Sequence, residues 1–449
     1  MASEPDLAEY LTVIDSRTQQ KYTIDITNNS VKATDFSQIT PFPPTTNPEN
    51  QTTSGLRIFD KGFLNTACVE SSITFIDGNR GQIRYRNYSI NELFENNDYE
   101  DVLHLLIWGH LPSSQEKMKV RSALAAEMNP PQSVVDTIQS FPRDSPPCPM
   151  IIGGMSAFAA VDEGATKVHS QRRPYYLGNT KAVDAAIIKS MAIFATTVAL
   201  VYCHKRGHSF TPADPNGSYI GNLLRMMGFG RNKKDGIRVG EVEKCLERVW
   251  ILYADHEMTN STTAFLHAAS TLTDPISSSI PCIVSAHGPL HGGAIDLVYK
   301  EFEQVGSVEN VPRLIEEVKA KKQRLFGYGH RIYKTVDPRT LHIREMIDEH
   351  LEGSKAASDP LLQVAIEIDR IASSDSYFVS RNLHANADLY GALLYSILGF
   401  ETDIIVAMTC VARGAGIMAH WREAMQQGPM LWRPQQMYTE LAQPQNGST

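Results

Sequence analysis

Apolar residues recur at helical spacing in one segment after another from about residue 100 onward, and this pattern constrains the fold most strongly. It predicts helices over Asp101–Gly109, Ala182–His204, Val242–Tyr253, Pro312–Lys322, Thr340–Leu351, Leu361–Ile371 and Tyr390–Phe400. β-like runs lie only near the start, at Tyr10–Ile14, Lys21–Ile26, Ile73–Ile76 and Gln82–Tyr85, the last two forming a hairpin signal. The sequence therefore predicts a mostly α fold with a small N-terminal β element.

Segments rich in Pro, Gly, Ser, Thr, Asn or Asp interrupt this pattern. Residues Pro41–Thr53 are predicted to be a linker. Breaks between helices are expected at Pro142–Pro149, Thr211–Gly217, Asp274–Pro281 and Gly353–Pro360.

Composition narrows the class of protein. The 449 residues are 42% hydrophobic and 20% charged, which is typical of a folded globular chain. There are 42 Lys and Arg against 50 Asp and Glu, a net charge of −8, and no long basic block, which argues against nucleic acid as a main partner. Six cysteines without a CxxC pair indicate free buried thiols in a reducing compartment.

Targeting and membrane signals point to the cytosol. The apolar stretch Ser190–Cys203 carries two threonines and is too short to span a bilayer, so no membrane association is expected. Acidic residues precede the first basic residue, Arg17, which is the opposite of a mitochondrial transit peptide. The terminal Asn446–Thr449 is no peroxisomal address.

Histidines gather in one part of the chain, where eight of the fourteen lie between His256 and His384. In Leu325–Arg339, glycines flank His330, and an arginine follows Asp-Pro. Glycines let backbone approach a ligand, a histidine can exchange a proton with a carbonyl, and the fork of Arg339 suits a carboxylate. The alternative is a loop histidine that caps a helix.

Two further segments offer histidines. In Ser285–Gly293, His291 precedes glycines that can open a helix and leave its amides free. Its spacing from His287 suggests a metal, but Gly288 and Pro289 break the helix and no HExxH is present, so structural histidines remain the alternative. His256 is the single candidate in Ala254–Met258, because adjacent side chains cannot all face one point.

A carboxylate and two arginines complete the candidates. Asp388 lies at an expected helix start, where it is either an N-cap or a general base. Arg413 and Arg433 stand in apolar surroundings, and a buried arginine needs an anionic partner. If no protein carboxylate meets them, a ligand carboxylate is the natural one.

In this order, the segments resemble the citrate synthase family from about Leu56 to Arg433-Pro434. The resemblance is carried by Gly327–Arg339, Gly288–Gly293 and Ala387-Asp388. It implies a two-domain helical fold. The large domain comprises residues 56–294 and 389–435, and the small domain, residues 295–388, closes over the substrates. Residues 1–55 form a β-rich segment and linker, and residues 436–449 form a tail.

The resemblance also implies roles for particular residues. Asp388 would remove the α-proton of an acyl-CoA thioester, His291 would stabilise the enolate oxygen, and His330 would polarise the ketone of oxaloacetate. The carboxylates of oxaloacetate would be held by His256, Arg339, Arg413 and Arg433, and a CoA phosphate by Lys334. Hydrolysis of the adduct would release CoA.

The family also implies the cofactors and partners. No metal or cofactor is expected, since acyl-CoA is a substrate. The expected catalytic unit is a homodimer, with Arg433 reaching the active site of the neighbouring subunit.

Three positions differ from the residues that are common in this family, and they bear on the choice of substrate. Ile295 and Thr259 stand where many members carry asparagine, and Asn87 where glycine is common. These features look more like the alkylcitrate synthases of fungal polyketide pathways, which accept a longer acyl-CoA. The alternatives are an ordinary citrate or 2-methylcitrate synthase, an inactive homologue that binds acyl-CoA or dicarboxylate, and a metal hydrolase built on His256, His287, His291 and Asp388.

Overall fold

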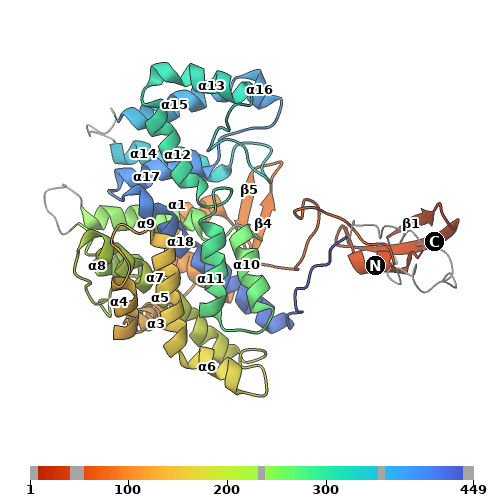
Figure 1. The fold of residues 1–449 in the computed structure, drawn as a ribbon, viewed down its shortest axis with the longest axis horizontal. Coiled ribbons are helices and arrows are strands. Elements are labelled where there is room, and N and C mark those ends of the chain that lie inside the picture. The colour runs from red at the N-terminus through yellow and green to blue at the C-terminus, as the bar shows by residue number, and fades with distance from the viewer. Residues whose placement is uncertain (1–8, 41–54, 231–237, 352–358, 438–449) are drawn as a thin grey trace, which may run out of the picture. The chain divides into compact units, whose positions relative to one another are not determined.

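The computed structural model describes residues 9–40, 55–230, 238–351 and 359–437 (Figure 1). The chain forms two compact units, Met1–Glu70 and Ser71–Thr449. The predicted linker at Pro41–Thr53 falls on residues outside the described ranges. The boundaries proposed for a large and a small helical domain, like those of the terminal segments, stay predictions.

The first unit contains an antiparallel sheet in the order β1-β2-β3, as the two β-like runs predict. Its elements are β1 (Tyr10–Asp15), β2 (Gln20–Thr27), β3 (Ser30–Val31) and the 3-10 helix η1 (Ala33–Gln38). Asn28 and Asn29, both at positive φ, connect β2 to β3. Asparagine tolerates this conformation, which a two-residue hairpin turn requires.

The second unit begins with the predicted hairpin and is then almost entirely helical. Its sheet has the antiparallel order β4-β5-β6, with Ile76 opposite Ile83. The strands are β4 (Thr74–Asp77), β5 (Gln82–Tyr85) and β6 (Tyr88–Ser89).

The helices confirm the mostly α prediction, and each of the seven expected segments overlaps a helix. Pro312–Lys322 and Tyr390–Phe400 each extend three residues past the end of theirs. In chain order the helices are α1 (Ile90–Asn96), α2 (Tyr99–Trp108), α3 (Ser114–Glu127), α4 (Gln132–Gln139), α5 (Pro147–Val161), α6 (Glu163–Ser170), α7 (Thr180–Arg206), α8 (Tyr219–Met227), α9 (Val239–Tyr253), α10 (Asn260–Ala269), α11 (Pro275–Ala286), α12 (Ala294–Val305), η4 (Val308–Asn310), α13 (Val311–Lys319), α14 (Pro338–Leu351), α15 (Pro360–Ala372), α16 (Ser376–Val379), α17 (Ala387–Ile397) and α18 (Thr402–Gln427).

The predicted break at Asp274–Pro281 is wrong, because α11 begins there. The Asp274 side chain accepts a hydrogen bond from the backbone N–H of Ser277, and Pro275 occupies the first helical position. Both are helix-start signals, since an N-cap oxygen satisfies a free amide and proline there lacks only an unneeded donor. The Pro142–Pro149 break likewise overlaps the start of α5.

Two long apolar helices form the centre of the second unit. α7 starts at the N-cap Asn179 and ends at Gly207, whose φ is 66°. α18 packs against α7, α2 and α9. Both helices are long and apolar enough to cross a membrane, but 78% of each apolar window is buried inside the protein. Packing within a core accounts for their composition.

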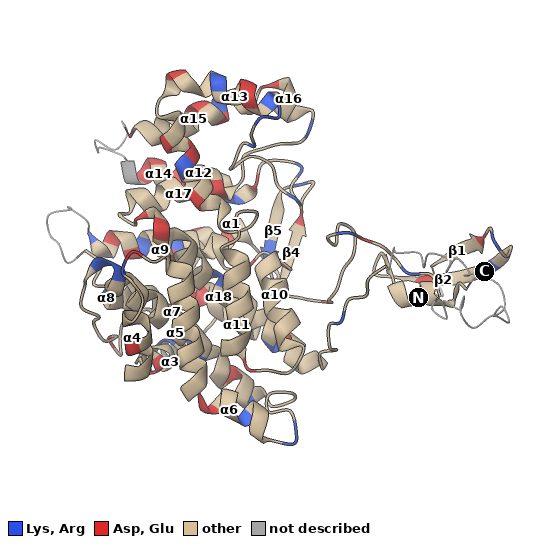
Figure 2. Ribbon diagram, in the orientation of Figure 1, with Lys and Arg blue, Asp and Glu red and all other residues tan. Residues whose placement is uncertain are grey.

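Charged residues of both signs are mixed along α13 and α15, as Figure 2 shows. Oppositely charged neighbours pair there, as with Lys319, which contacts Glu316 and Asp375 at 3.0 Å each. The six cysteines are free, as expected, but only Cys203 and Cys282 are buried and Cys68 is exposed.

Candidate active site

His330 lies on a non-helical loop whose glycines permit its shape. Gly327 and Gly329 have φ of 76° and 84°, and a Cβ on Gly327 would lie 2.9 Å from Cα of Leu389. His330 Nδ1 accepts from the backbone N–H groups of Ile332 at 3.1 Å and Tyr333 at 3.3 Å. Amide nitrogens only donate, so Nδ1 is the acceptor and the ring proton is on Nε2. His330 therefore caps a turn, and the helix-cap interpretation does not apply.

Backbone hydrogen bonds join this loop to the start of α17. The N–H of Gly329 donates to the carbonyl oxygen of His384 at 2.7 Å, and that of Asn386 donates to Gly327 at 2.9 Å. The Asn386 side chain also donates to the carbonyl oxygen of Gly329 at 2.9 Å. His330 and Asp388 are thus held on one hydrogen-bonded unit.

Asp388 is not the N-cap of α17. Asn386 is, because its side chain accepts from the backbone N–H of Asp388 at 3.0 Å. No described residue donates a hydrogen bond to the Asp388 carboxylate. Burial raises the pKa of this carboxyl to about 6, against the charge of Arg339. A carboxylate of that pKa is a stronger base than an ordinary aspartate.

His291 lies in the turn between α11 and α12 and accepts hydrogen bonds at Nε2, whereas His330 accepts them at Nδ1. Its Nε2 accepts from the backbone N–H of Ser261 at 3.3 Å and lies 2.8 Å from Ser261 Oγ. The proton is therefore on Nδ1. Burial and the charge of Arg413 lower the pKa of His291 to about 4, while burial and Arg339 lower that of His330 to about 4. Both rings are neutral at pH 7.

The expectation that His291 and His287 are not paired metal ligands agrees with the contacts of each ring. His287 Nδ1 lies 2.9 Å from the carbonyl oxygen of Ile283. Within the described ranges, three ligand atoms come within 4.8 Å of one another only at His104, His110 and Glu116. The set His256, His287, His291 and Asp388 forms no such group.

His256 follows α9 and is buried beside the His330 loop. Its Nε2 lies 2.9 Å from the hydroxyl of Tyr333, and its ring centroid lies 5.4 Å from that of His330. Burial, Arg339 and Arg413 hold the pKa of His256 well below its usual range. Tyr333 is a residue of this site that the sequence reasoning missed, although it lies in the same motif, three residues after His330.

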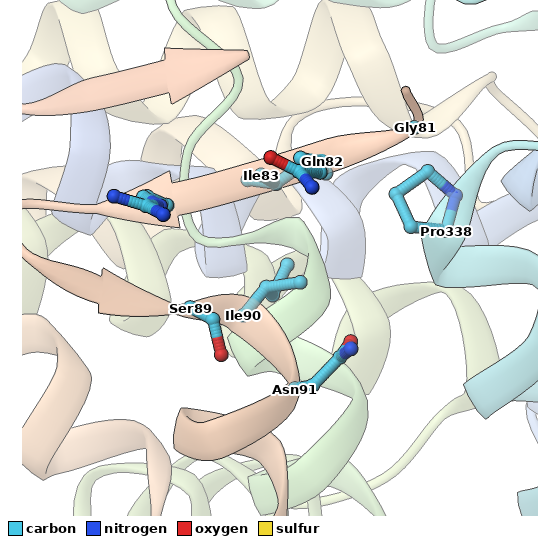
Figure 3. Close-up of a pocket in the computed structure, with 8 residues that line it drawn as sticks. Gly81, Gln82, Ile83, Ser89, Ile90, Asn91 and Pro338 are labelled. Carbon is cyan, nitrogen blue, oxygen red and sulfur yellow. The ribbon is translucent and has the colours of Figure 1, made fainter. Parts of the chain in front are cut away.

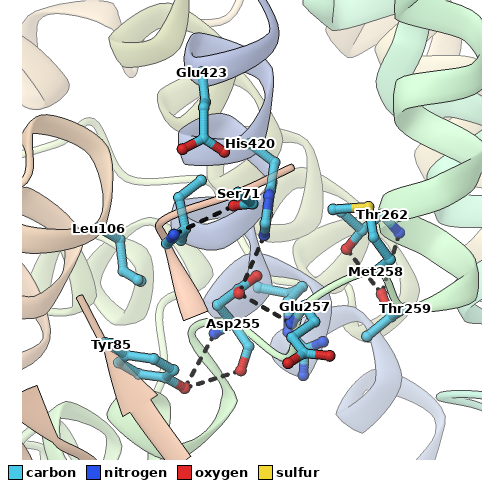
Figure 4. Close-up of polar contacts among 12 residues, drawn as sticks. Ser71, Tyr85, Leu106, Asp255, Glu257, Met258, Thr259, Thr262, His420 and Glu423 are labelled. Atoms are coloured by element: carbon cyan, nitrogen blue, oxygen red, sulfur yellow. Dashed lines mark hydrogen bonds and ion pairs between the residues drawn. The ribbon is translucent and has the colours of Figure 1, made fainter. Parts of the chain in front are cut away.

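The segment around His256 is fixed through its neighbour Asp255 (Figure 4). The Tyr85 hydroxyl donates to the Asp255 carbonyl oxygen at 2.9 Å and accepts from its N–H at 3.2 Å. His420 Nε2 lies 3.2 Å from Asp255 Oδ2. These contacts connect the hairpin, the end of α9 and α18, so the backbone that carries His256 has little freedom.

The two inner arginines differ in their partners. Arg339 is buried and makes a bidentate pair with Asp337, at 3.0 Å from Nε to Oδ1 and 2.6 Å from Nη2 to Oδ2. Arg413 Nε donates to the carbonyl oxygen of Tyr253 at 2.6 Å, and no described carboxylate pairs with it. Arg339 thus pairs with a protein carboxylate, whereas Arg413 pairs with none among the described residues.

Arg433 and Lys334 are both exposed in this chain, although the charge of Lys334 contributes to lowering the pKa of His330. Arg433 is exposed, so the expectation of an apolar, buried setting is wrong within a single chain. It follows Trp432, whose N–H donates to Ser270 Oγ at 3.1 Å and whose ring lies 6.3 Å from that of His267. Lys334 is exposed as well, and its backbone N–H donates to Gly78 at 2.9 Å.

The three departures occupy different settings. Ile295 is buried in α12, and its Cδ1 lies 3.4 Å from where a Cβ on Gly391 of α17 would be. Thr259 is the N-cap of α10, and its Oγ1 lies 3.1 Å from Ser261 Oγ, the hydroxyl that contacts His291. Asn87 is exposed in the turn between β5 and β6. Thr259 is therefore linked to His291 through Ser261, and Ile295 packs against α17, the helix that carries Asp388.

A separate pocket of about 180 Å³ lies between the hairpin and the start of α14 (Figure 3). It is lined by Gly81, Gln82, Ile83, Arg84, Ser89, Ile90, Asn91 and Pro338. No predicted site residue lines it, and it is small for a ligand pocket. The converging histidines, and not this cavity, therefore define the candidate site.

Known proteins share both the sequence and the fold. The model of the citrate synthase C-terminal domain matches residues 62–435. A citrate synthase-like protein of Aspergillus oryzae is 46% identical over 96% of both chains, and an alkylcitrate synthase of Talaromyces stipitatus is 37% identical over 95% of this chain and 94% of its own. A Thermoplasma acidophilum citrate synthase, solved as a ternary complex with carboxymethyl coenzyme A and oxaloacetate, is 26% identical. Its TM-score is 0.77, covering 87% of this chain and 98% of that one.

A mostly helical fold, two neutral histidines and an aspartate whose carboxylate accepts no hydrogen bond from a described residue suit an enzyme that condenses acyl groups by acid–base chemistry. The family match spans far more than half of the residues. The chain belongs to the citrate synthase family.

Proposed function

We propose that this protein condenses an acyl-CoA longer than acetyl-CoA with oxaloacetate, and then hydrolyses the thioester to an alkylcitrate and CoA in secondary metabolism. The condensation is supported by two neutral histidines with opposite ring protons and one carboxylate of raised pKa. Backbone hydrogen bonds join the His330 loop to the start of α17, which carries Asp388, and the charge of Arg413 acts on the pKa of both His291 and Asp388. The longer acyl group is supported by the similarity to an alkylcitrate synthase and by the departures at Ile295 and Thr259.

The first step is removal of the thioester α-proton. Asp388 takes this proton, and the electron pair moves to the thioester oxygen to give an enolate. The Nδ1–H of His291 then donates to that oxygen, because Nε2 is already occupied by Ser261. Such a donor is worth about 10²–10³ in rate.

The second step forms the carbon–carbon bond. The α-carbon of the enolate attacks the ketone carbon of oxaloacetate, and the C=O electron pair moves to the ketone oxygen, which is hydrogen-bonded to Nε2–H of His330. This oxygen takes up a proton to become the hydroxyl of the adduct, and Asp388 releases the α-proton to solvent. The oxaloacetate carboxylates are held by Arg413, Arg339 and His256, with Lys334 contributing to CoA binding. Water then cleaves the thioester. No step changes an oxidation state overall, and we propose that no metal or cofactor takes part.

We propose that the catalytic unit is a homodimer in which Arg433 completes the site of the other subunit. The support is that Arg433 is exposed in its own chain, while Trp432 beside it is anchored to α10. This can be tested by mixing two inactive variants, Asp388→Asn and Arg433→Ala, after unfolding and refolding them together. Random pairing should restore about a quarter of wild-type activity, because each mixed dimer has one intact site. No recovery would contradict the shared site.

The substrate is tested by measuring CoA release with oxaloacetate and thioesters from acetyl to dodecanoyl, with product masses confirmed. A maximum at longer chains is expected, and Asp388→Asn is the control for non-enzymatic hydrolysis. A maximum at acetyl or propionyl would instead assign an ordinary citrate or 2-methylcitrate synthase. Absence of release with every thioester would favour a binding-only homologue.

A further inference from the structure

α2, the turn after it and the start of α3 each carry one side chain of a possible metal-binding group that the proposed reaction does not use. His104, His110 and Glu116 bring one ligand atom each within 4.8 Å of one another. We propose that these three residues bind a divalent transition-metal ion of the zinc class. Two imidazoles and one carboxylate suit zinc, with a water as the fourth ligand.

His104 is oriented as a metal-binding histidine is. It lies in α2 and is 5% exposed, and its Nδ1 lies 2.9 Å from the carbonyl oxygen of His110. A carbonyl only accepts, so Nδ1 carries the proton and Nε2 has the free lone pair. Metal-binding histidines characteristically donate their second nitrogen to a carbonyl in this way. Nε2 has no partner among the described residues and is not among the fully buried polar atoms without one, so solvent reaches it.

Glu116 is held by one oxygen and offers the other. Its Oε2 accepts from the N–H of Ser113 at 2.8 Å and from the Ser113 hydroxyl at 2.7 Å, in the capping box of α3. Oε1 lies 3.3 Å from His110 Nε2. Two ligands about 2.1 Å from a tetrahedral ion are themselves about 3.4 Å apart, so this pair is already spaced for one.

His110 is placed over His104 by the end of α2. Gly109 has a φ of 88°, a conformation that favours glycine, and it reverses the chain after Trp108. The His104 and His110 ring centroids are then 4.8 Å apart and the rings nearly perpendicular. The His110 and Glu116 side chains are 57% and 43% exposed, which leaves them free to close around an ion.

An ion pair between His110 and Glu116 would account for their contact without a metal. It would not involve His104 Nε2, which remains without a protein partner. A bound ion would join all three residues and tie the end of α2 to the start of α3. Since α2 contacts α18 through Tyr99, whose hydroxyl donates to the carbonyl oxygen of Ala412 at 2.8 Å, such a tie would stabilise the native state.

The test is calorimetric titration of the full-length protein with Zn²⁺, supported by the absorption spectrum of Co²⁺ bound in its place. We expect one site per chain whose affinity falls at least about tenfold in His110→Ala and in Glu116→Gln. Glutamine keeps the capping box, so α3 should still fold. His169→Ala, at an exposed histidine of α6, is the matched control and should bind as the wild type does.

Two results would overturn the proposal. One is the absence of Zn²⁺ binding at micromolar concentrations. The other is equal affinity in the wild type, His110→Ala and Glu116→Gln, which would place the ion elsewhere. Melting temperature gives an independent readout, because Zn²⁺ should raise it in the wild type and in His169→Ala, but not in the other two variants.

Discussion

His291 and His330 are both neutral, half-buried imidazoles, yet the chain holds them in opposite ways. His291 accepts at Nε2 from Ser261, an amide thirty residues earlier in the chain. His330 accepts at Nδ1 from amides two and three residues later. One is therefore left with a proton on Nδ1 and the other with a proton on Nε2.

The difference shows how one residue type can present its donor N–H at either ring nitrogen, as the two proposed roles require. A neutral imidazole has one donor and one acceptor, and the backbone amide decides which nitrogen is which. Burial lowers the pKa of both rings, together with the charge of Arg413 at His291 and of Arg339 at His330, and this keeps each ring neutral. Side-chain identity alone therefore does not define the role of either histidine.

The largest expected effect is on Asp388, the proposed base. Asp388→Asn should lower kcat by about 10²–10⁴-fold, because the amide cannot accept the α-proton. Oxaloacetate binding should change little, because Asp388 acts on the other substrate. Steady-state kinetics and oxaloacetate calorimetry measure the two quantities. A large loss of oxaloacetate affinity would show that Asp388 has a different role.

The comparison between the histidines is tested most directly by amide replacements. His291→Ala and His330→Ala should each lower kcat about 10²–10³-fold. The amide of asparagine reaches about as far as Nδ1 and that of glutamine about as far as Nε2. Asparagine should therefore restore more activity than glutamine at position 291, and glutamine more than asparagine at 330. The same order at both positions would disprove the assigned ring protons.

A smaller effect is expected at the arginine without a protein carboxylate. Arg413→Ala should weaken oxaloacetate binding by about 2 kcal/mol, roughly thirtyfold in Kd, because a charged pair with the ligand is lost. The control is Arg313→Ala on α13, whose side chain is 73% exposed. An unchanged dissociation constant for Arg413→Ala would remove this arginine from the site.

The smallest effect is the dependence of kcat/KM on pH. The Asp388 pKa is raised to about 6, so the carboxylate form needed for proton removal is lost as the pH falls through 6. Activity should then drop about tenfold per pH unit. Both histidines have pKa values near 4 and stay neutral over this range, so the decline belongs to Asp388. A midpoint near 4 would contradict this assignment.

Much of the fold follows from local patterns, and the errors have physical causes. Helical periodicity identified α7 and α9, and alternation identified the β4-β5 hairpin. Asp274–Pro281 was misinterpreted because Ser and Pro composition suggests a loop, while an aspartate N-cap before proline starts a helix. Burial of Arg433 could not be inferred from apolar neighbours, because Trp432 is the residue that packs while Arg433 stays exposed.

The candidate site was only partly accessible from sequence. His291, His330 and Asp388 could be named from their motifs, and the pairing of Arg339 with Asp337, two residues earlier, was within reach of the same motif. The ring protons could not be assigned, since Ser261 meets His291 only in the folded chain. Nor could the sequence show that Asn386 caps α17 and leaves the Asp388 carboxylate available.

The close approach of Gly327 to α17 has a consequence for how such a protein can diverge. The separation of Asp388 from His330, the groups proposed to remove the proton and to activate the ketone, is set by main-chain hydrogen bonds across this approach, not by side-chain size. Mutation at surrounding positions can therefore alter the acyl group accepted while the spacing of the reactive groups is inherited unchanged. A single methyl group at position 327 would force the two backbones apart, so variation that is tolerated nearby should be excluded there.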